Sequence, residues 1–189
     1  EGGSLIVVRL NYDSIYAQHS FGRVRIWFGE LDESALSELP VASSHWYIVG
    51  PYATENGATS YDTAFGPEEA GPLNFGKKYN KQSWRYAPGV IDESLVTLAQ
   101  GIGAEYIGRE IFVPSARTLK VSLGSDDGLQ VYLNGSIVHE NRINRGVNVD
   151  QDQVTLNLES GLNTLVLKVT NTGGPRGMYY HALDNESEI

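Results

Sequence analysis

Two adjacent carboxylates, Asp126 and Asp127, are the residues of this chain whose types and spacing most clearly suit chemistry. They lie in the run Gly-Ser-Asp-Asp-Gly at positions 124–128, between two stretches in which apolar and polar residues alternate. Neighbouring carboxylates at the end of a strand can supply oxygen ligands to calcium or accept hydrogen bonds from vicinal hydroxyls. Aspartates in a turn can also accept hydrogen bonds from nearby backbone N–H groups. Both interpretations of the pair stay open at this level.

A second polar segment contains Arg145, Asp150 and Asp152. The guanidinium of Arg145 could form a structural ion pair with Asp126 or Asp127. Its planar fork could also donate to sugar oxygens or to the carboxylate of a uronic acid. We expect the ion pair to be its main role, and we expect Asp150 and Asp152 to assist in binding the ligand of the turn.

Aromatic rings are the other candidate contacts, because a flat ring can pack against the C–H groups on one side of a pyranose. The candidates are Trp46, Tyr61, Phe65, Trp84, Tyr86 and Tyr132. Trp46 is expected in the core, since the run Trp-Tyr-Ile-Val is apolar throughout. Trp84 lies between a serine and an arginine, which favours a surface position. Tyr132 points away from its apolar neighbours, so it faces solvent or lies beneath a loop.

Composition argues against several classes of function. The 189 residues carry 14 Lys and Arg against 23 Asp and Glu, a net charge of −9, and no basic run that could neutralise nucleic-acid phosphates. No apolar stretch approaches the roughly 18 residues of a membrane helix, and the absence of cysteine excludes disulfides and thiolate metal sites within the chain. Neither a Gly-x-Ser-x-Gly nor a His-Glu-x-x-His motif occurs, and no pair of carboxylates is marked as a glycosidase acid and base. We therefore do not expect an enzyme.

The elements that must hold these residues are predicted to be short strands. Apolar and polar residues alternate at 119–123, 129–133 and 154–158, which is the period of a half-buried strand. Asn134 and Gly135 predict a tight hairpin turn, because both central positions of that turn need positive φ. The turn with the two aspartates would thus be held at the end of a rigid antiparallel meander.

The remaining segments indicate the same fold class. A strand is expected over 104–113, with Gly108 as a bulge, and residues 52–79, which are rich in Gly and Pro, predict a long loop. About ten short strands without helical periodicity predict an all-β sandwich or barrel of antiparallel sheets.

Six segments of the sequence resemble a known family. They read WYIVGPY, YDTAFGPE, WRYAPG, EYIGREI, SLGSDDGLQVYLNG and RGVNVDQDQVTLNLESGLNTLVLKV. Together they are similar to a galactose-binding-like β-sandwich module of planctomycete multidomain proteins that carry cytochrome c and planctomycete-specific domains. The resemblance implies a jelly-roll sandwich that binds carbohydrate without cleaving it, outside the cytoplasm, in the periplasm or at the cell surface. The Ser-Asp-Asp-Gly turn also looks like the turn of sugar-binding adhesin domains, where paired aspartates hold a calcium ion that grips sugar hydroxyls.

We expect residues 36–189 to form this module. Residues 1–35 would add a hairpin, either as the tail of a preceding repeat or as extra strands of the sandwich. The expected partners are a polysaccharide or oligosaccharide and other domains of a longer parent chain, with no nucleic acid and no membrane insertion. The expected ligand contacts are Asp126, Asp127, Arg145, Trp84, Tyr132, Asp150 and Asp152, with the two turn aspartates able to hold calcium. The alternative is a structural spacer that docks other domains of the parent chain.

Overall fold

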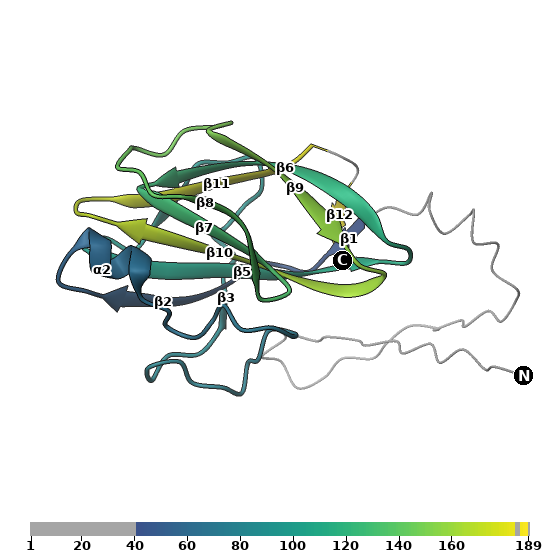
Figure 1. Ribbon diagram of the computed structural model, residues 1–189, viewed down its shortest axis with the longest axis horizontal. Helices are drawn as coiled ribbons and strands as arrows, with labels where there is room; N and C mark the ends of the chain where they lie inside the picture. The colour runs from purple at the N-terminus through teal and green to yellow at the C-terminus, as the bar shows by residue number, and fades with distance from the viewer. Residues whose placement is uncertain (1–40, 184–185, 189) are drawn as a thin grey trace, which may run out of the picture. The chain divides into compact units, whose positions relative to one another are not determined.

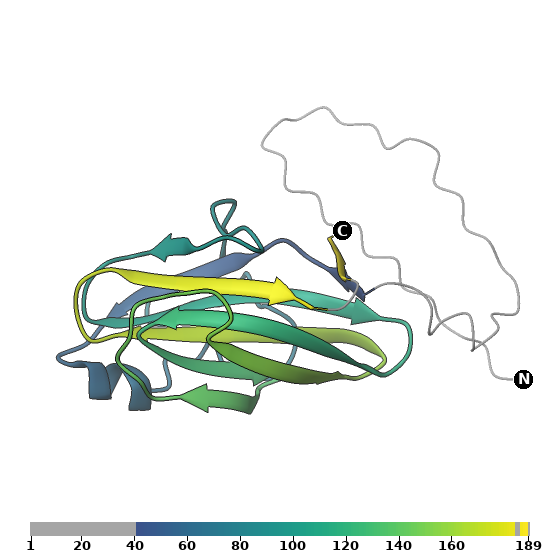
Figure 2. The same cartoon turned by 90° about the horizontal axis from the view of Figure 1, so that it is seen from above.

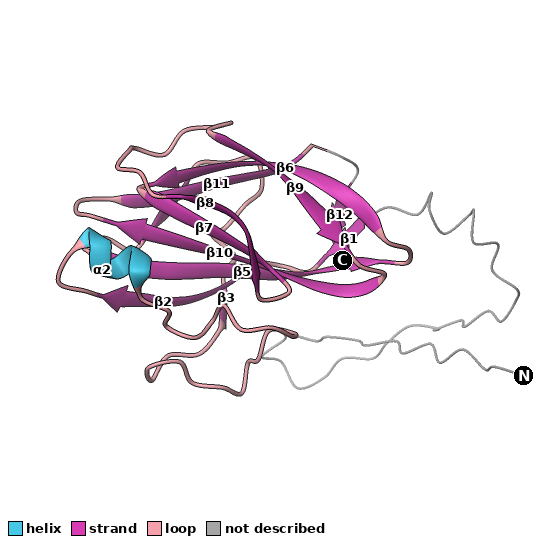
Figure 3. Ribbon diagram, viewed as in Figure 1, coloured by secondary structure: helices cyan, strands magenta, loops and turns pink. Residues whose placement is uncertain are grey.

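The computed structural model describes residues 41–183 and 186–188, all within a compact unit formed by residues 32–189. The hairpin expected over residues 1–35 and the boundary at residue 35 lie outside the described residues. The described chain is almost entirely β-structure, arranged as two sheets (Figures 1 and 3). No helix in the described part has the length and apolarity needed to cross a bilayer.

The larger sheet has eight strands among the described residues. In spatial order it contains β12 (Glu186–Glu188), β1 (Val41–Ser43), β5 (Gly103–Val113), β10 (Gly161–Asn171), β7 (Gly128–Leu133) and β8 (Ser136–Asn141), while β2 (Tyr47–Ala53) pairs with β5 and with β3 (Arg85–Tyr86). The smaller sheet has the order β4 (Val96–Leu98), β11 (Arg176–Ala182), β6 (Arg117–Asp126) and β9 (Asp152–Leu158). All pairings are antiparallel except β1 with β12. The prediction of an all-β antiparallel sandwich is confirmed.

The main core lies between the two sheets. Successive side chains of a strand point to opposite faces of its sheet, so every second side chain points into this space. Leu119, Val121 and Leu123 of β6 meet Leu129 and Val131 of β7 in one cluster of buried residues. A second cluster covers the opposite face of the larger sheet, where the segment after β2 folds over Tyr106, Tyr132 and Val166. Both faces of β5, β7 and β10 are therefore buried, which explains their nearly continuous burial.

The β7–β8 hairpin turns as predicted, because Asn134 and Gly135 have φ values of 52° and 82°. The predicted bulge at Gly108 is wrong, since β5 and β10 pair without interruption through that residue. A Cβ at Gly108 would lie 3.0 Å from the ring of Trp84, so the glycine makes room for packing. The pairing of β5 is irregular instead against β2, between Val49 and Tyr52.

Within the segment predicted as a long loop, helix α2 (Gly57–Asp62) forms one and a half turns. The carboxamide of Asn56 caps it, because its oxygen accepts a hydrogen bond from the Thr59 N–H at 2.8 Å. Figure 2, viewed from above, shows α2 and β8 along the same side of the larger sheet. Sequence periodicity does not reveal a helix this short.

Candidate functional site

The turn with the two aspartates connects β6 to β7, as expected, but the side chains differ sharply in their surroundings. The Asp127 carboxylate is 4% exposed. One of its oxygens accepts a hydrogen bond from the backbone N–H of Arg145 at 2.9 Å. The other accepts from the backbone N–H of Thr172 at 2.8 Å and from the Thr172 hydroxyl at 2.6 Å. Asp127 thus fastens two neighbouring segments to the turn, which is the capping alternative.

Asp126 is partly buried, and its carboxylate accepts no hydrogen bond within the described residues. Burial raises the pKa of this carboxyl, and the negative charge of Asp127 raises it further, while Arg176 acts in the opposite direction. The peptide bond between the two aspartates is cis. Only Asp126 of the pair keeps its carboxylate oxygens open to another partner.

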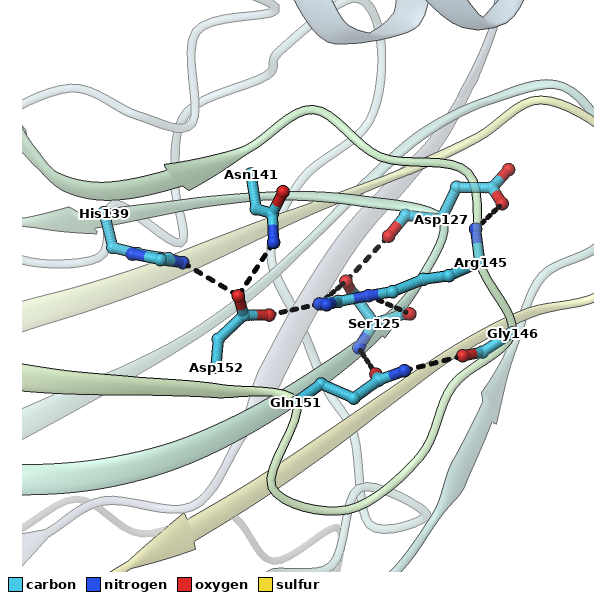
Figure 4. Close-up of polar contacts among 8 residues, drawn as sticks. All are labelled: Ser125, Asp127, His139, Asn141, Arg145, Gly146, Gln151 and Asp152. Atoms are coloured by element: carbon cyan, nitrogen blue, oxygen red, sulfur yellow. Dashed lines mark hydrogen bonds and ion pairs between the residues drawn. The ribbon is translucent and has the colours of Figure 1, made fainter.

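Arg145 forms an ion pair with Asp152 rather than with Asp126 or Asp127, as Figure 4 shows. Its guanidinium also donates to the Ser125 hydroxyl at 2.9 Å and to the Ser125 carbonyl at 3.2 Å. Asp152 is 8% exposed. It accepts a hydrogen bond from Asn141 at 2.9 Å. Burial acts to raise the pKa of Asp152, but the hydrogen bonds from Arg145 and Asn141 outweigh it and lower the pKa.

The loop between β8 and β9 is held in place along its length. The Gln151 carboxamide accepts from the Ser125 N–H at 3.0 Å and donates to the Gly146 carbonyl at 2.8 Å (Figure 4). The exposed Asp150 accepts a hydrogen bond from the Ser122 hydroxyl. Asp150 and Asp152 therefore have different roles, since Asp150 lies at the surface and Asp152 is buried against Arg145.

The structure confirms some of the predictions for the aromatic side chains and contradicts one. Trp46 is in the core, as expected. The surface position predicted for Trp84 is wrong, because this side chain is 5% exposed and packs over Gly108. The serine and the arginine beside it in the sequence do not indicate exposure, because Trp84 points inward between them. Tyr132 lies beneath the segment after β2, buried to 7% exposure.

The residues around the turn do not fit a calcium ion. Calcium takes six to eight oxygen ligands, several of them carboxylates. No group of three or more His, Cys, Asp or Glu side chains in the described part of the chain could hold a metal ion. The oxygens of Asp127 already accept three hydrogen bonds. A calcium ion bound by both aspartates would have to displace these contacts.

An open pocket of about 560 Å³ lies beside this turn, on the outer face of the larger sheet. Its lining side chains are Tyr61, Asp62, Ala64, Gln130, Tyr132, Ile137, Glu140, Arg142 and Lys168. A Cβ at Gly128 would lie 3.0 Å from the ring of Tyr61, so the start of β7 packs directly against one wall of the pocket. The pocket has the size range of small-molecule sites.

The floor of the pocket is a row of three polar residues on adjacent strands. Lys168 of β10 is the register partner of Gln130 of β7, and Gln130 is the register partner of Glu140 of β8. Side chains at one register position on neighbouring strands point to the same face of a sheet. The row therefore places an ammonium, an amide and a carboxylate side by side, of which Lys168 is 1% exposed, Gln130 is 7% exposed and Glu140 is exposed.

The walls of the pocket come from α2 and from the residue that follows β8. Arg142 forms a two-pronged ion pair with Asp62, with N–O distances of 2.8 and 3.0 Å. Its guanidinium lies 5.2 Å from the centre of the Tyr61 ring. Both charged side chains are more than half exposed. Such an exposed pair adds little stability, so its groups can exchange partners with a ligand at small cost.

Three contacts hold α2 over the sheet. The Lys168 ammonium donates to the carbonyl oxygens of Tyr61 and Thr63, at 2.7 and 2.8 Å, at the C-terminal end of the helix. At the other end, a Cβ on Gly57 would lie 2.3 Å from a methyl carbon of Thr172, so the helix begins in direct contact with that residue. Thr172 is in turn fastened by Asp127. Asp127 is therefore a positioning residue for the pocket and not part of its lining.

Burial shapes the ionisation of two lining groups. It lowers the pKa of Lys168 to about 8, against the opposing effect of Glu68 and Asp62. The amine therefore still carries its charge at neutral pH, with one N–H left over after its two carbonyl contacts. Burial also raises the pKa of Tyr132 to about 12, so its phenol stays protonated.

Sequence reasoning found the tyrosines of this pocket but missed its polar floor and Arg142. Gln130 and Lys168 each interrupt a strand that is otherwise dominated by apolar residues. A polar residue within an apolar strand could have indicated this site, because a polar residue on a covered face needs partners. The two residues share a row only because β7 pairs with β10. More than thirty residues lie between them in the sequence, so local patterns do not reveal this pairing.

Comparisons with known proteins identify no family for the chain. No family model matches it, and neither does any curated protein. Among solved structures, a "PA14 sugar-binding domain from RTX adhesin" is similar at 19% identity and a TM-score of 0.33, over 42% of this chain and 46% of that one. The PA14 domain of the MpAFP antifreeze protein is similar at 14% identity and a TM-score of 0.38, over 77% and 86%. A β-glucosidase from Kluyveromyces marxianus, solved in complex with glucose, has 10% identity and a TM-score of 0.38, over 71% of this chain and 18% of its own. The chain thus spans less than half of the adhesin domain and under a fifth of the glucosidase.

Proposed function

We propose that this chain is a carbohydrate-binding module that does not cleave its ligand and that serves a larger exported protein. The observation that carries the proposal is the row formed by Lys168, Gln130 and Glu140 at the floor of an open pocket beside Tyr61. A sugar presents closely spaced hydroxyls, each of which donates and accepts hydrogen bonds. The exposed carboxylate accepts from one hydroxyl, while the largely buried amide and ammonium beside it offer donors to a hydroxyl that reaches the floor.

The other parts of the pocket suit the same class of ligand. The exposed Arg142 and Asp62 lie at the rim, where they can exchange their mutual ion pair for hydrogen bonds to sugar hydroxyls. The pocket is open, so a bound sugar would keep much of its hydration and affinity would be modest. Binding would be enhanced where a polysaccharide or a parent protein supplies several sites.

The more detailed expectations remain part of the proposal. They are the jelly-roll winding, the galactose-binding-like family, the planctomycete multidomain parent, and a periplasmic or cell-surface location. One of the similar structures is a sugar-binding domain and another was solved with glucose, but likenesses this distant add no weight to the proposed ligand class.

A structural spacer is the second candidate function. One observation favours it: Phe112 of β5 and Leu162 of β10 are register partners and are 46% and 47% exposed. Adjacent exposed apolar side chains of this kind are frequent where another domain docks. A spacer would show no retention by any polysaccharide.

Affinity electrophoresis through gels that contain neutral or acidic polysaccharides tests the proposal. We expect at least one polysaccharide to retard the wild-type chain. Glu140→Gln and Arg142→Ala should be retarded less, each relative to its own mobility in a gel without polysaccharide, while keeping the wild-type circular dichroism spectrum. A parallel gel with EDTA reports any calcium requirement, and assay of reducing ends after incubation reports cleavage. Wild-type mobility unchanged by every polysaccharide would contradict the proposal and favour the spacer.

A further inference from the structure

A second hollow, of about 310 Å³, lies away from the pocket described above, at the loop that follows β3. Its lining side chains include Tyr86, Pro88, Ile91 and Asp92. The loop is fixed at both ends by backbone hydrogen bonds. The Ala87 N–H donates to the Trp46 carbonyl at 2.9 Å, and the Glu93 N–H donates to the Tyr180 carbonyl at 2.8 Å. The hollow is thus part of the folded framework.

A carboxylate in the hollow is held by buried donors. One oxygen of Asp92 accepts a hydrogen bond from the indole N–H of Trp46 at 2.6 Å. The other accepts from the guanidinium of Arg109 at 2.8 Å. Trp46 and Arg109 are 3% and 1% exposed, whereas the Asp92 side chain is 38% exposed. A carboxylate has about four acceptor positions, so two of them are left to face the hollow in a fixed orientation.

An exposed aromatic ring also lines the hollow. Tyr86 is 47% exposed, and its backbone pairs with Tyr47 across β2 and β3. Its ring is supported by His45, at 5.4 Å between ring centres, and by Tyr47, at 6.2 Å. These contacts fix the orientation of the ring, so little side-chain freedom remains to be lost when a ligand packs against it.

We propose that this hollow is a second glycan-binding site, in which one pyranose residue packs its C–H face on Tyr86 and its hydroxyls bond to Asp92. A cation is a poorer fit, because Arg109 already neutralises the carboxylate. The face of Trp46 is not available for a cation either, since the Arg109 guanidinium lies 4.4 Å from the centre of its ring. A neutral polyol matches an oriented acceptor beside a ring without bringing an unpaired charge.

This inference rests on the proposed function for the class of ligand, but it concerns different residues and can fail separately. NMR titration with neutral hexasaccharides of β-1,4-linked glucose, mannose or galactose tests it. We expect at least one of them to shift the methyl signals of Ile91 in the wild-type chain. Tyr86→Ala should weaken that binding about five- to tenfold, which is the size of a lost aromatic contact of about 1 kcal/mol. Tyr86→Phe keeps the ring and should stay within about twofold.

The controls separate the two sites. Leu95→Ala removes an exposed apolar side chain that does not line the hollow and should leave the Ile91 titration unchanged. Glu140→Gln, in the first pocket, should also leave it unchanged. No shift at Ile91 with any of the three sugars would overturn this inference, whether or not Gln130 shifts, whereas unretarded migration in every polysaccharide gel would overturn the proposed function as well. Equal affinities of Tyr86→Ala and the wild type for a sugar that shifts Ile91 would remove the assigned contact.

Discussion

Substitution of Asp127 by alanine should destabilise the fold strongly, whereas the same substitution at Asp126 should not. Asp126 and Asp127 are adjacent in the same turn and have the same side chain, but only Asp127 accepts hydrogen bonds through its carboxylate. Its removal leaves the N–H of Arg145 and both the N–H and the hydroxyl of Thr172 without an acceptor. Each buried donor left unsatisfied costs about 1–3 kcal/mol.

The three donors are partly accessible, so water satisfies some of them in the variant, and the lower part of that range applies. We expect a loss of about 2–4 kcal/mol in the free energy of unfolding for Asp127→Ala, out of the roughly 5–15 kcal/mol typical of a domain. Asp126→Ala should stay within about 0.5 kcal/mol of the wild type, because it removes no hydrogen bond. It also relieves the repulsion that raises the pKa of Asp126.

Urea denaturation followed by tryptophan fluorescence measures both variants. In thermal unfolding, a loss of 3 kcal/mol corresponds to a midpoint lower by about 6–12 °C for a domain of this size. A double-mutant cycle with Thr172→Val isolates the contact between the two side chains, for which we expect a coupling energy of about 1 kcal/mol. Equal stabilities of Asp127→Ala and Asp126→Ala would refute the conclusion that Asp127 fastens the turn.

Three further predictions concern packing and pH. Gly124→Ala should lower the free energy of unfolding by about 2 kcal/mol or more, because its Cβ would lie 1.9 Å from the Asn148 carbonyl oxygen. A smaller loss in urea denaturation would show that the loop moves freely. Hydrogen bonds from Arg145 depress the pKa of Asp152, so this carboxylate contributes stability above its unfolded pKa that is lost as pH falls through the folded value. The stability difference between wild type and Asp152→Asn should therefore shrink on acidification, and a constant difference would contradict the assignment. Burial raises the pKa of Tyr106, so the stability it contributes below its unfolded pKa of about 10 should decline as pH rises above that value. Tyrosinate absorbance should accordingly grow together with the loss of circular dichroism, and Tyr106→Phe should unfold at a higher pH.

The strands were predictable because their alternation is local. Residues 119–123 and 129–133 show period two in the sequence and are strands in the structure, joined through the turn that contains the aspartates. The hairpin at Asn134 was equally predictable, since its turn chemistry is local as well. Helix α2 could not be anticipated, because its position is fixed by Lys168, which lies over one hundred residues away.

The functional residues were only partly predictable for the same reason. The sequence places Asp126 and Asp127 together but does not say which of them meets Thr172, the residue that directly follows β10. It places Trp84 between polar neighbours, yet the ring fills the space above Gly108 and is buried. Charged side chains at a turn thus mark a region correctly, while their division between scaffold and binding surface is decided by tertiary contacts.

The most direct test of glycan binding at the larger pocket is the NMR signal of the Gln130 side-chain amide. This group lies at the centre of the polar row, between Lys168 and Glu140. We predict that a retained oligosaccharide shifts this signal in a saturable way, and that Glu140→Gln reduces the apparent affinity while the spectrum stays that of the folded chain. A Gln130 amide signal unmoved by every oligosaccharide, including any that the polysaccharide gels show to bind, would contradict glycan binding at this pocket.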